Sequence, residues 1–213
     1  MYTLFYSPGS AAMAPHAVLE EIGAPHKLVK VDLKGGEHRK PEYLKVNPKG
    51  RVPVLVIGDN TFTESAAIVM HLCDRHPDKV LAPAPGTVER GRYYQWLLYL
   101  TNTVQPALIE YFHPDWTFED AAHCGPLKAS AEKRVGTMFA YIDAELGKSG
   151  PYLTGKQFTA ADIFLFMLAR WTRFFAKPGY QYPNVKRLTD QVKARPAIER
   201  MMAAQGIMHV EKA

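Results

Sequence analysis

The sequence predicts two folded parts in series, an α/β domain followed by an all-helical domain. Up to about residue 75, short apolar runs bounded by glycine or proline alternate with helical patterns. A segment rich in proline then ends at Gly86, and strand signals largely stop beyond it. We therefore expect the first domain over residues 1–76, a linker over 77–86 and the helical domain over 87–213.

Composition is that of a soluble globular chain and narrows the classes of function. Of the 213 residues, 47% are hydrophobic and 22% are charged, so the chain can bury a core and disorder is not indicated. The net charge is +5, but the basic residues are scattered, which does not predict a nucleic-acid partner. No apolar run has the length of a membrane span and no leader pattern opens the chain, so we expect a cytoplasmic protein.

The first elements are a strand, a helix and a second strand. Tyr2–Tyr6 is an apolar run that ends at Ser7-Pro8-Gly9, and the helical pattern from about Ala11 to Ile22 stops at Gly23. Pro15 fits only a first turn, so the regular helix should begin no earlier than about Ala12. Residues 27–32 alternate and read as the second strand, and residues 33–46 read as a loop with a short irregular helix.

The stretch Asn47–Val69 supplies two more strands and a helix. Residues 53–57 form a strand pattern, Gly58-Asp59-Asn60 a turn, residues 61–63 a short strand, and 65–75 a helix. Pro53 has two interpretations, and the low frequency of cis X–Pro bonds favours the first when the residue is taken alone. It can be an ordinary strand start, or the Val52–Pro53 bond can be cis, which would turn the main chain of Val52 towards an extended peptide ligand.

Glu64 and Ser65 open the last helix of the first domain. Ser65 is a good N-cap, and the free N–H groups behind it suit a carboxylate. Glu64 would offer a counter-charge to an ammonium group. The pair therefore suits an α-amino acid end, although a capped surface helix with a solvated glutamate is the better explanation when the pair is taken alone.

Taken together, these motifs resemble a cytosolic glutathione transferase. The resemblance is carried by Ser7-Pro8-Gly9-Ser10, by Asn47-Pro48-x-Gly50-x-Val52-Pro53-x-Leu55 and by Glu64-Ser65-x-Ala67-Ile68. It extends through the helical half to about Gln205. It implies an N-terminal thioredoxin-like domain of order βαβαββα followed by a C-terminal helical bundle.

The resemblance also implies a binding site for glutathione. Its γ-glutamyl end would lie at Glu64 and Ser65, its main chain at Val52 and Pro53, and its glycine carboxylate at one or two of three basic side chains. The implied glutathione-binding residues are Ala11, Lys34, His38, Arg51, Val52, Pro53, Glu64 and Ser65.

The loop that would activate the glutathione thiol departs from the class that it most resembles. It is most similar to the bacterial beta class, whose members usually carry a cysteine where this chain has Ala11. Ser10 is then the nearest hydroxyl donor to a thiolate, and Tyr6 is the rival donor. A third interpretation makes Ser10 a mere cap and leaves the work to the N–H groups of Ala11 and Ala12. Residues 7–13 hold no cysteine, which argues against dithiol–disulfide chemistry.

The second half predicts helices and one structural motif. Helical patterns cover residues 87–112, with Pro106 as a kink, then 129–146, 160–175 and 183–203. Thr159 and Asp162 form a capping box to which we assign a structural role. Aromatic residues at helical spacing are more often core than ligand contacts, but the resemblance implies an electrophile pocket on the first long helix, with Leu98, Asn102, Gln105 and Tyr111 as its candidates.

The expected activity is conjugation of the glutathione thiolate to small hydrophobic electrophiles, with glutathione as co-substrate and without a metal or redox cofactor. Cys73 and Cys124 have no metal-type spacing, and Cys73 is expected in the core. The alternatives are a non-catalytic binding or interaction module of the same fold, and a glutathione-dependent isomerase or dehalogenase. Ser10-Ala11-Ala12 departs from the Ser-Ser-Cys motif of maleylacetoacetate isomerases. The resemblance further implies a homodimer.

Overall fold

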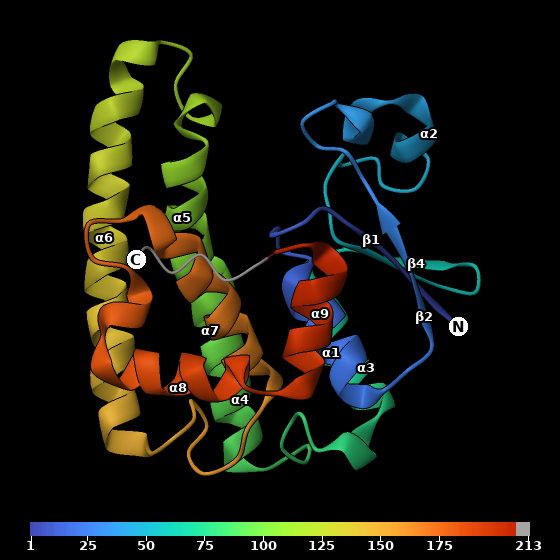
Figure 1. Cartoon of the computed structure of the whole chain (residues 1–213), viewed down its shortest axis with the longest axis vertical. Coiled ribbons are helices and arrows are strands. Elements are labelled where there is room, and N and C mark those ends of the chain that lie inside the picture. The colour runs from blue at the N-terminus through green and yellow to red at the C-terminus, as the bar shows by residue number, and fades with distance from the viewer. Residues whose placement is uncertain (208–213) are drawn as a thin grey trace. The chain divides into compact units, whose positions relative to one another are not determined.

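The computed structural model describes residues 1–207 and divides them into two compact units (Figure 1). The first unit contains residues 1–82 and 193–207, and the second contains residues 83–192. The first is α/β and the second is helical, which confirms the predicted fold class. The predicted boundaries at 76 and 86 stay predictions, and residues 208–213 of the predicted helical domain lie outside the described residues.

The first unit is built on a four-stranded sheet in the order β2-β1-β3-β4. β1 pairs in parallel with β2 and antiparallel with β3, and β3 pairs antiparallel with β4. The mixed pairing follows from the connections: a helix returns the chain parallel to β1, whereas a tight turn at Gly58 makes β3 and β4 a hairpin. The strands are β1 (Tyr2–Tyr6), β2 (His26–Lys30), β3 (Val54–Ile57) and β4 (Asn60–Phe62).

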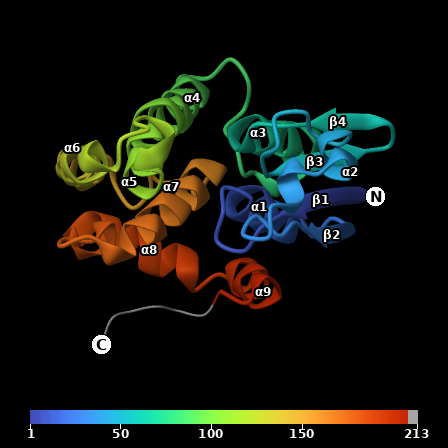
Figure 2. The same cartoon turned by 90° about the horizontal axis from the view of Figure 1, so that it is seen from above.

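Three helices of ten or more residues accompany the sheet in the described part of this unit: α1 (Met13–Ile22), α3 (Ser65–Arg75) and α9 (Pro196–Gln205). α1 packs against both α3 and α9 (Figure 2). α1 is buried over most of its length because it lies among these elements, and it ends at Gly23 in the left-handed conformation, as its sequence predicts. Residues 33–46 form the expected loop and short helices, η1 (Glu37–Arg39) and α2 (Pro41–Leu44).

The second unit contains five α-helices within residues 83–192. α6 packs along α5, and α7 contacts α4. Residues 160–169 of α7 are all buried, so α7 is the central helix of this unit. The helices are α4 (Val88–Tyr99), α5 (Gln105–Phe112), α6 (Ala121–Ser149), α7 (Ala160–Trp171) and α8 (Pro183–Lys193), with short 3₁₀ turns η4 (Pro114–Trp116), η5 (Thr172–Phe174) and η6 (Gly179–Gln181).

The first helical run of this unit is not regular. The sequence predicts one helix over 87–112 with a kink at Pro106, and a π-helix, η3 (Leu100–Val104), separates α4 from α5 just before that proline. Pro106 cannot donate a hydrogen bond into the preceding turn, and widening that turn is one way in which a helix accommodates it. Thr87 caps the run, because its hydroxyl accepts from the Arg90 N–H.

The capping box of α7 is present as predicted. The Asp162 carboxylate accepts from the Thr159 N–H at 2.7 Å and from the Leu153 N–H at 2.9 Å. The side chain is fully buried, and desolvation raises the pKa of Asp162 to about 7, against the lowering effect of these donors. Its contacts are all within its own unit and all local, which fits a structural role.

Candidate functional site

The loop between β1 and α1 is organised by the Ser10 side chain. The Ser10 hydroxyl donates to the Ser7 carbonyl at 2.7 Å and accepts from the Ala12 N–H at 3.3 Å. These two bonds form a turn ahead of the helix, and α1 starts only at Met13, one residue later than the earliest start that the sequence allows. Ser10 therefore has a structural task in this loop, whatever else it does.

Tyr6 and Ala11 lie on either side of this turn. Tyr6 ends β1 and is 7% exposed, and its ring lies near the His16 ring of α1, with 6.3 Å between the centroids. Ala11 is half-buried and lies between Ser10 and the buried Ala12. The hydroxyl candidates of the sequence thus flank the start of the same helix.

The segment before β3 is held by a buried asparagine. The Arg51 carbonyl accepts from Asn47 Nδ2 and from the Tyr43 hydroxyl, both at 2.7 Å. Asn47 Oδ1 in turn accepts from the Lys49 N–H. Asn47 is 2% exposed, and its partly buried bonds fix the turn that leads into residue 52.

Val52 follows this turn and lies outside the sheet. The Val52–Pro53 bond is cis, which is the second of the two interpretations of Pro53. β3 begins only at Val54, so neither the N–H nor the C=O of Val52 belongs to a sheet ladder. A main-chain donor and acceptor are therefore left beside the end of a strand, which is the arrangement that binds an extended peptide.

The start of α3 differs from the prediction. Ser65 is the first helical residue and not the N-cap; Glu64 occupies the cap position, with φ 65° and no side-chain cap bond. The first helical hydrogen bond runs from the Ile68 N–H to the Glu64 carbonyl. The N–H groups of residues 65–67 therefore lie at the open, positive end of the helix. The Glu64 carboxylate pairs with Lys49 Nζ at 2.9 Å, and both side chains are exposed.

The three basic candidates for a glycine carboxylate occupy different environments. The Lys34 and Arg51 side chains are exposed, whereas His38 is half-buried, and its Nδ1 has no hydrogen-bond partner among the described residues. Gly50 lies close to His38: a Cβ on Gly50 would meet the His38 carbonyl at 3.0 Å, and φ of Gly50 is +59°. The loop of His38 and the loop of Arg51 are therefore in contact.

The four electrophile candidates in the second unit also differ in exposure. Leu98 and Asn102 are exposed and Gln105 is half-buried, and they follow one another along α4, η3 and α5. Tyr111 is buried: its ring lies 4.4 Å from that of Phe175, and Lys128 Nζ lies over its face. Burial raises the pKa of the Tyr111 hydroxyl, with a further contribution from Glu132.

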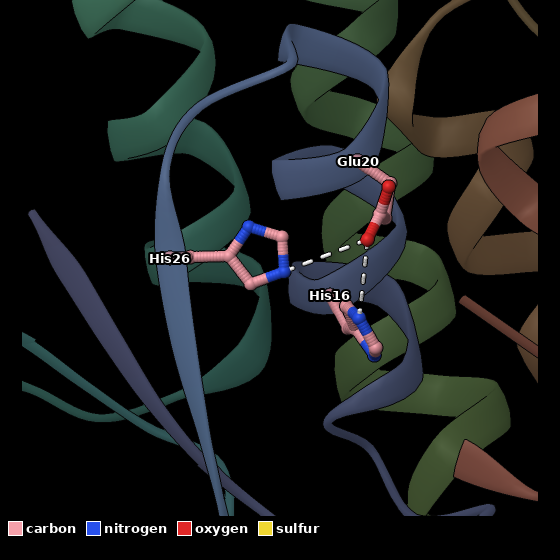
Figure 3. Close-up of side chains that lie close together, drawn as sticks. All are labelled: His16, Glu20 and His26. Carbon is pink, nitrogen blue, oxygen red and sulfur yellow. Dashed lines mark ion pairs between the residues drawn. The ribbon is translucent and has the colours of Figure 1, made fainter. Parts of the chain in front are cut away.

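Sequence reasoning missed one polar cluster in the first unit. His16 and Glu20 of α1 and His26 of β2 point towards one another (Figure 3). Glu20 Oε1 lies 3.7 Å from His16 Nε2 and 3.5 Å from His26 Nε2. His16 is fully buried, and desolvation, with the nearby His26, lowers its pKa to about 4. The i, i+4 spacing of His16 and Glu20 was the available signal.

Both halves of the chain match family profiles. The N-terminal domain of glutathione S-transferase matches residues 1–74, and the glutathione S-transferase C-terminal domain matches residues 119–205. The glutathione S-transferase GstA of Escherichia coli O157:H7 is 31% identical over 206 residues, which are 96% of this chain and 98% of the relative.

Solved structures of the same kind cover nearly all of the chain. A bacterial beta-class glutathione S-transferase from Sphingomonas chungbukensis is 33% identical, with a TM-score of 0.85 over 97% of this chain and 100% of its own. A glutathione transferase homologue from Sulfitobacter, solved with bound glutathione, is 25% identical, with a TM-score of 0.90 over 98% and 99% of the two chains.

These matches place the chain in a class of two-domain transferases that act on glutathione. The chain belongs to the glutathione S-transferase family, and its relatives include bacterial beta-class members. Ala11 stands at the position where the resemblance implies their cysteine; Cys73 is buried, as expected, and Cys124 is half-buried. None of the helices in residues 1–207 has the length and hydrophobicity that crossing a bilayer requires.

Proposed function

We propose that this glutathione transferase conjugates the glutathione thiolate to small hydrophobic electrophiles in the cytoplasm. The proposal rests on two features that occur in one domain. The main chain of Val52 takes no part in strand pairing, and the start of the helix at Ser65 has no side-chain cap. A peptide with an α-amino acid end needs both. The Sulfitobacter homologue, which has the same fold, was solved with glutathione bound.

The proposed binding mode uses these two features in turn. Val52 exchanges main-chain hydrogen bonds with the cysteinyl part of glutathione, and the N–H groups at Ser65 bind the γ-glutamyl carboxylate. Glu64 binds the ammonium group, in competition with its exposed partner Lys49. One of Lys34, His38 and Arg51 binds the glycine carboxylate, and His38 is the one with a buried ring nitrogen still unpaired among the described residues.

In the proposed binding mode the glutathione sulfur lies at the start of α1, where three groups are candidates to donate a hydrogen bond to the thiolate. The Ser10 hydroxyl already donates to Ser7, so it must rotate away from that carbonyl to donate to a thiolate. This geometry favours the N–H groups of the turn, including that of Ala11, as donors to the thiolate. The Tyr6 hydroxyl is the other candidate donor. The proposed reaction uses no metal. The residues proposed to bind the electrophile are Leu98, Asn102, Gln105 and Tyr111.

The experiment pairs a conjugation assay, using a general aromatic electrophile, with a calorimetric titration of glutathione. We expect binding and turnover that depends on both substrates. Binding without turnover over a broad panel of electrophiles would contradict the proposal and favour the second candidate, a non-catalytic glutathione-binding module. That candidate is supported by the engaged Ser10 hydroxyl and by Ala11.

We also propose a two-fold homodimer, because closed symmetry is the rule for such assemblies and the family resemblance implies it. Light scattering at micromolar concentration should give twice the chain mass of 23.9 kDa. A monomer mass at that concentration would contradict the proposed homodimer and would leave the proposed glutathione site unaffected.

A further inference from the structure

Gln205, near the end of α9, joins two distant parts of the first unit. Its Oε1 accepts from the Gly9 N–H at 3.1 Å, and its Nε2 lies 3.1 Å from His16 Nδ1. Gln205 is 4% exposed and His16 is fully buried, so the bond between them is shielded from water, whereas the bond to Gly9 is partly buried. Gly9 immediately precedes Ser10 in the loop at the start of α1, with φ +72°.

The direction of each bond is fixed by Gly9. A backbone N–H can only donate, so the atom of Gln205 that faces it is the carbonyl oxygen. The amide NH₂ then faces His16 and donates to Nδ1, which must carry a lone pair. Neutral His16 therefore bears its proton on Nε2, the nitrogen that faces Glu20.

This tautomer decides what the cluster of His16, Glu20 and His26 can do. A metal ion would need the lone pair of His16 Nε2, which is a donor here. The other oxygen of Glu20 already accepts from Arg200 Nε at 2.7 Å, which places a guanidinium beside the cluster. The His16 Nε2–H has no partner within hydrogen-bond distance among the described residues. In this tautomer His16 offers no lone pair to the cluster, so only Glu20 and His26 could ligate a metal ion.

We propose that Gln205 and His16 are positioning residues, which hold the Gly9–Ser10 turn in the conformation that receives the glutathione sulfur. The inference rests on the proposed function, in which this turn approaches the thiol. His16 Nδ1 anchors the NH₂ of the Gln205 amide, and the amide oxygen holds the Gly9 N–H. The turn itself is short and closed on Ser7, so a shift at Gly9 moves Ser10 and the N–H groups that follow it.

The tautomer can be measured on the wild-type protein without any assay of activity. Nitrogen-15 NMR of the imidazoles should show His16 with a protonated Nε2 and an unprotonated Nδ1 at neutral pH. Added zinc should leave these signals unchanged. A proton on Nδ1, or stoichiometric zinc binding that moves the His16 and His26 signals together, would overturn the inference.

Two substitutions at Gln205 distinguish a role of its hydrogen bonds from a role of its side-chain volume alone. Gln205→Met keeps the length and removes both bonds; we expect kcat to fall about three- to tenfold, the scale of one hydrogen bond, with KM within about twofold. Gln205→Glu keeps an oxygen for Gly9 and offers a second oxygen to His16, which must then donate from Nδ1. We expect Gln205→Glu to retain most of kcat while the His16 signals change tautomer.

The matched control is Gln191→Met, an exposed glutamine of α8, which should change neither kcat nor the Gly9 amide signal. An unchanged kcat in Gln205→Met, or an equal loss in both Gln205 variants, would overturn the inference. If Gln205→Met does not fold, the wild-type tautomer and Gln205→Glu still decide it. If the wild type shows no turnover, the proposed function fails, while the tautomer and the Gly9 amide shift in Gln205→Met still test the bonds.

Discussion

The helices α1 and α3 lie in the same unit and begin in opposite ways. α1 is preceded by a turn in which the Ser10 side chain takes up the Ala12 N–H and the Ser7 carbonyl. α3 is preceded by Glu64 with a positive φ, and no side chain caps it. The first helix start is closed by its own chain, whereas the second is left open. A helix end without a cap is the natural place for a ligand carboxylate.

The largest expected effect comes from removing the two side chains at the open end. Glu64→Ala with Ser65→Ala should abolish retention on immobilised glutathione and change the unfolding free energy by no more than about 2 kcal/mol, because neither side chain caps α3 and the pair of Glu64 with Lys49 is exposed. Glu42→Ala, an exposed glutamate of α2, is the control and should bind normally. Normal binding by the double variant would show that the site has been misplaced.

The second-largest effect distinguishes between Ser10 and Tyr6 as hydroxyl donors to the thiolate at the start of α1. Removing the main stabiliser of the thiolate should lower turnover on the order of tenfold to a thousandfold and raise the pKa of the bound thiol. Ser10→Ala and Tyr6→Phe are compared by turnover and by its pH dependence, with glutathione binding checked in each. If neither variant moves that pKa, both side chains lose the role and the N–H groups of the turn retain it.

A third prediction concerns the histidine behind the closed end. The folded state lowers the His16 pKa from 6.5 to about 4, so the native protein binds fewer protons than the unfolded chain between these values. Stability from this group is complete above pH 6.5 and falls as the pH drops towards 4, by about 3 kcal/mol in all. The charged or polar groups that reach it, directly or through Glu20, are Tyr6, Glu20, His26, Arg200 and Gln205.

Urea unfolding at several pH values tests this dependence. His16→Gln keeps an oxygen that can accept from Gln205 and removes the titration, so its stability should fall less between pH 6.5 and 4. A wild-type and a variant curve that stay parallel over that range would contradict the assignment to His16.

The smallest effect concerns the ion pair at the open end. Lys49 and Glu64 are both exposed, so Lys49→Ala should change the unfolding free energy by less than about 1 kcal/mol. It should tighten glutathione binding slightly, because it frees Glu64 for the ammonium group. Weaker binding in a calorimetric titration would mean that Lys49 itself contacts the ligand.

The sequence predicted the strands and most helices because their signals are local. Alternation, Pro53 and the Gly58 turn define β3 and β4, and Gly23 ends α1 as expected. The start of α3 was misjudged by one residue, since a positive φ at Glu64 leaves no mark in a sequence that offers Ser65 as a cap. The hydrogen bonds of Gln205 to Gly9 and His16 could not be predicted from the sequence for a different reason. Gln205 and His16 are 189 positions apart and come together only in the folded chain.

The central claim is that this chain binds glutathione and stabilises its thiolate, and the pKa of the bound thiol tests it most directly. The ultraviolet absorbance of the thiolate is titrated against pH for glutathione bound to the wild-type protein, with the free peptide as reference. The account predicts a pKa lowered by about two units, which corresponds to roughly 2.7 kcal/mol of preference for the anion. A bound thiol that titrates at the same pH as free glutathione would contradict it.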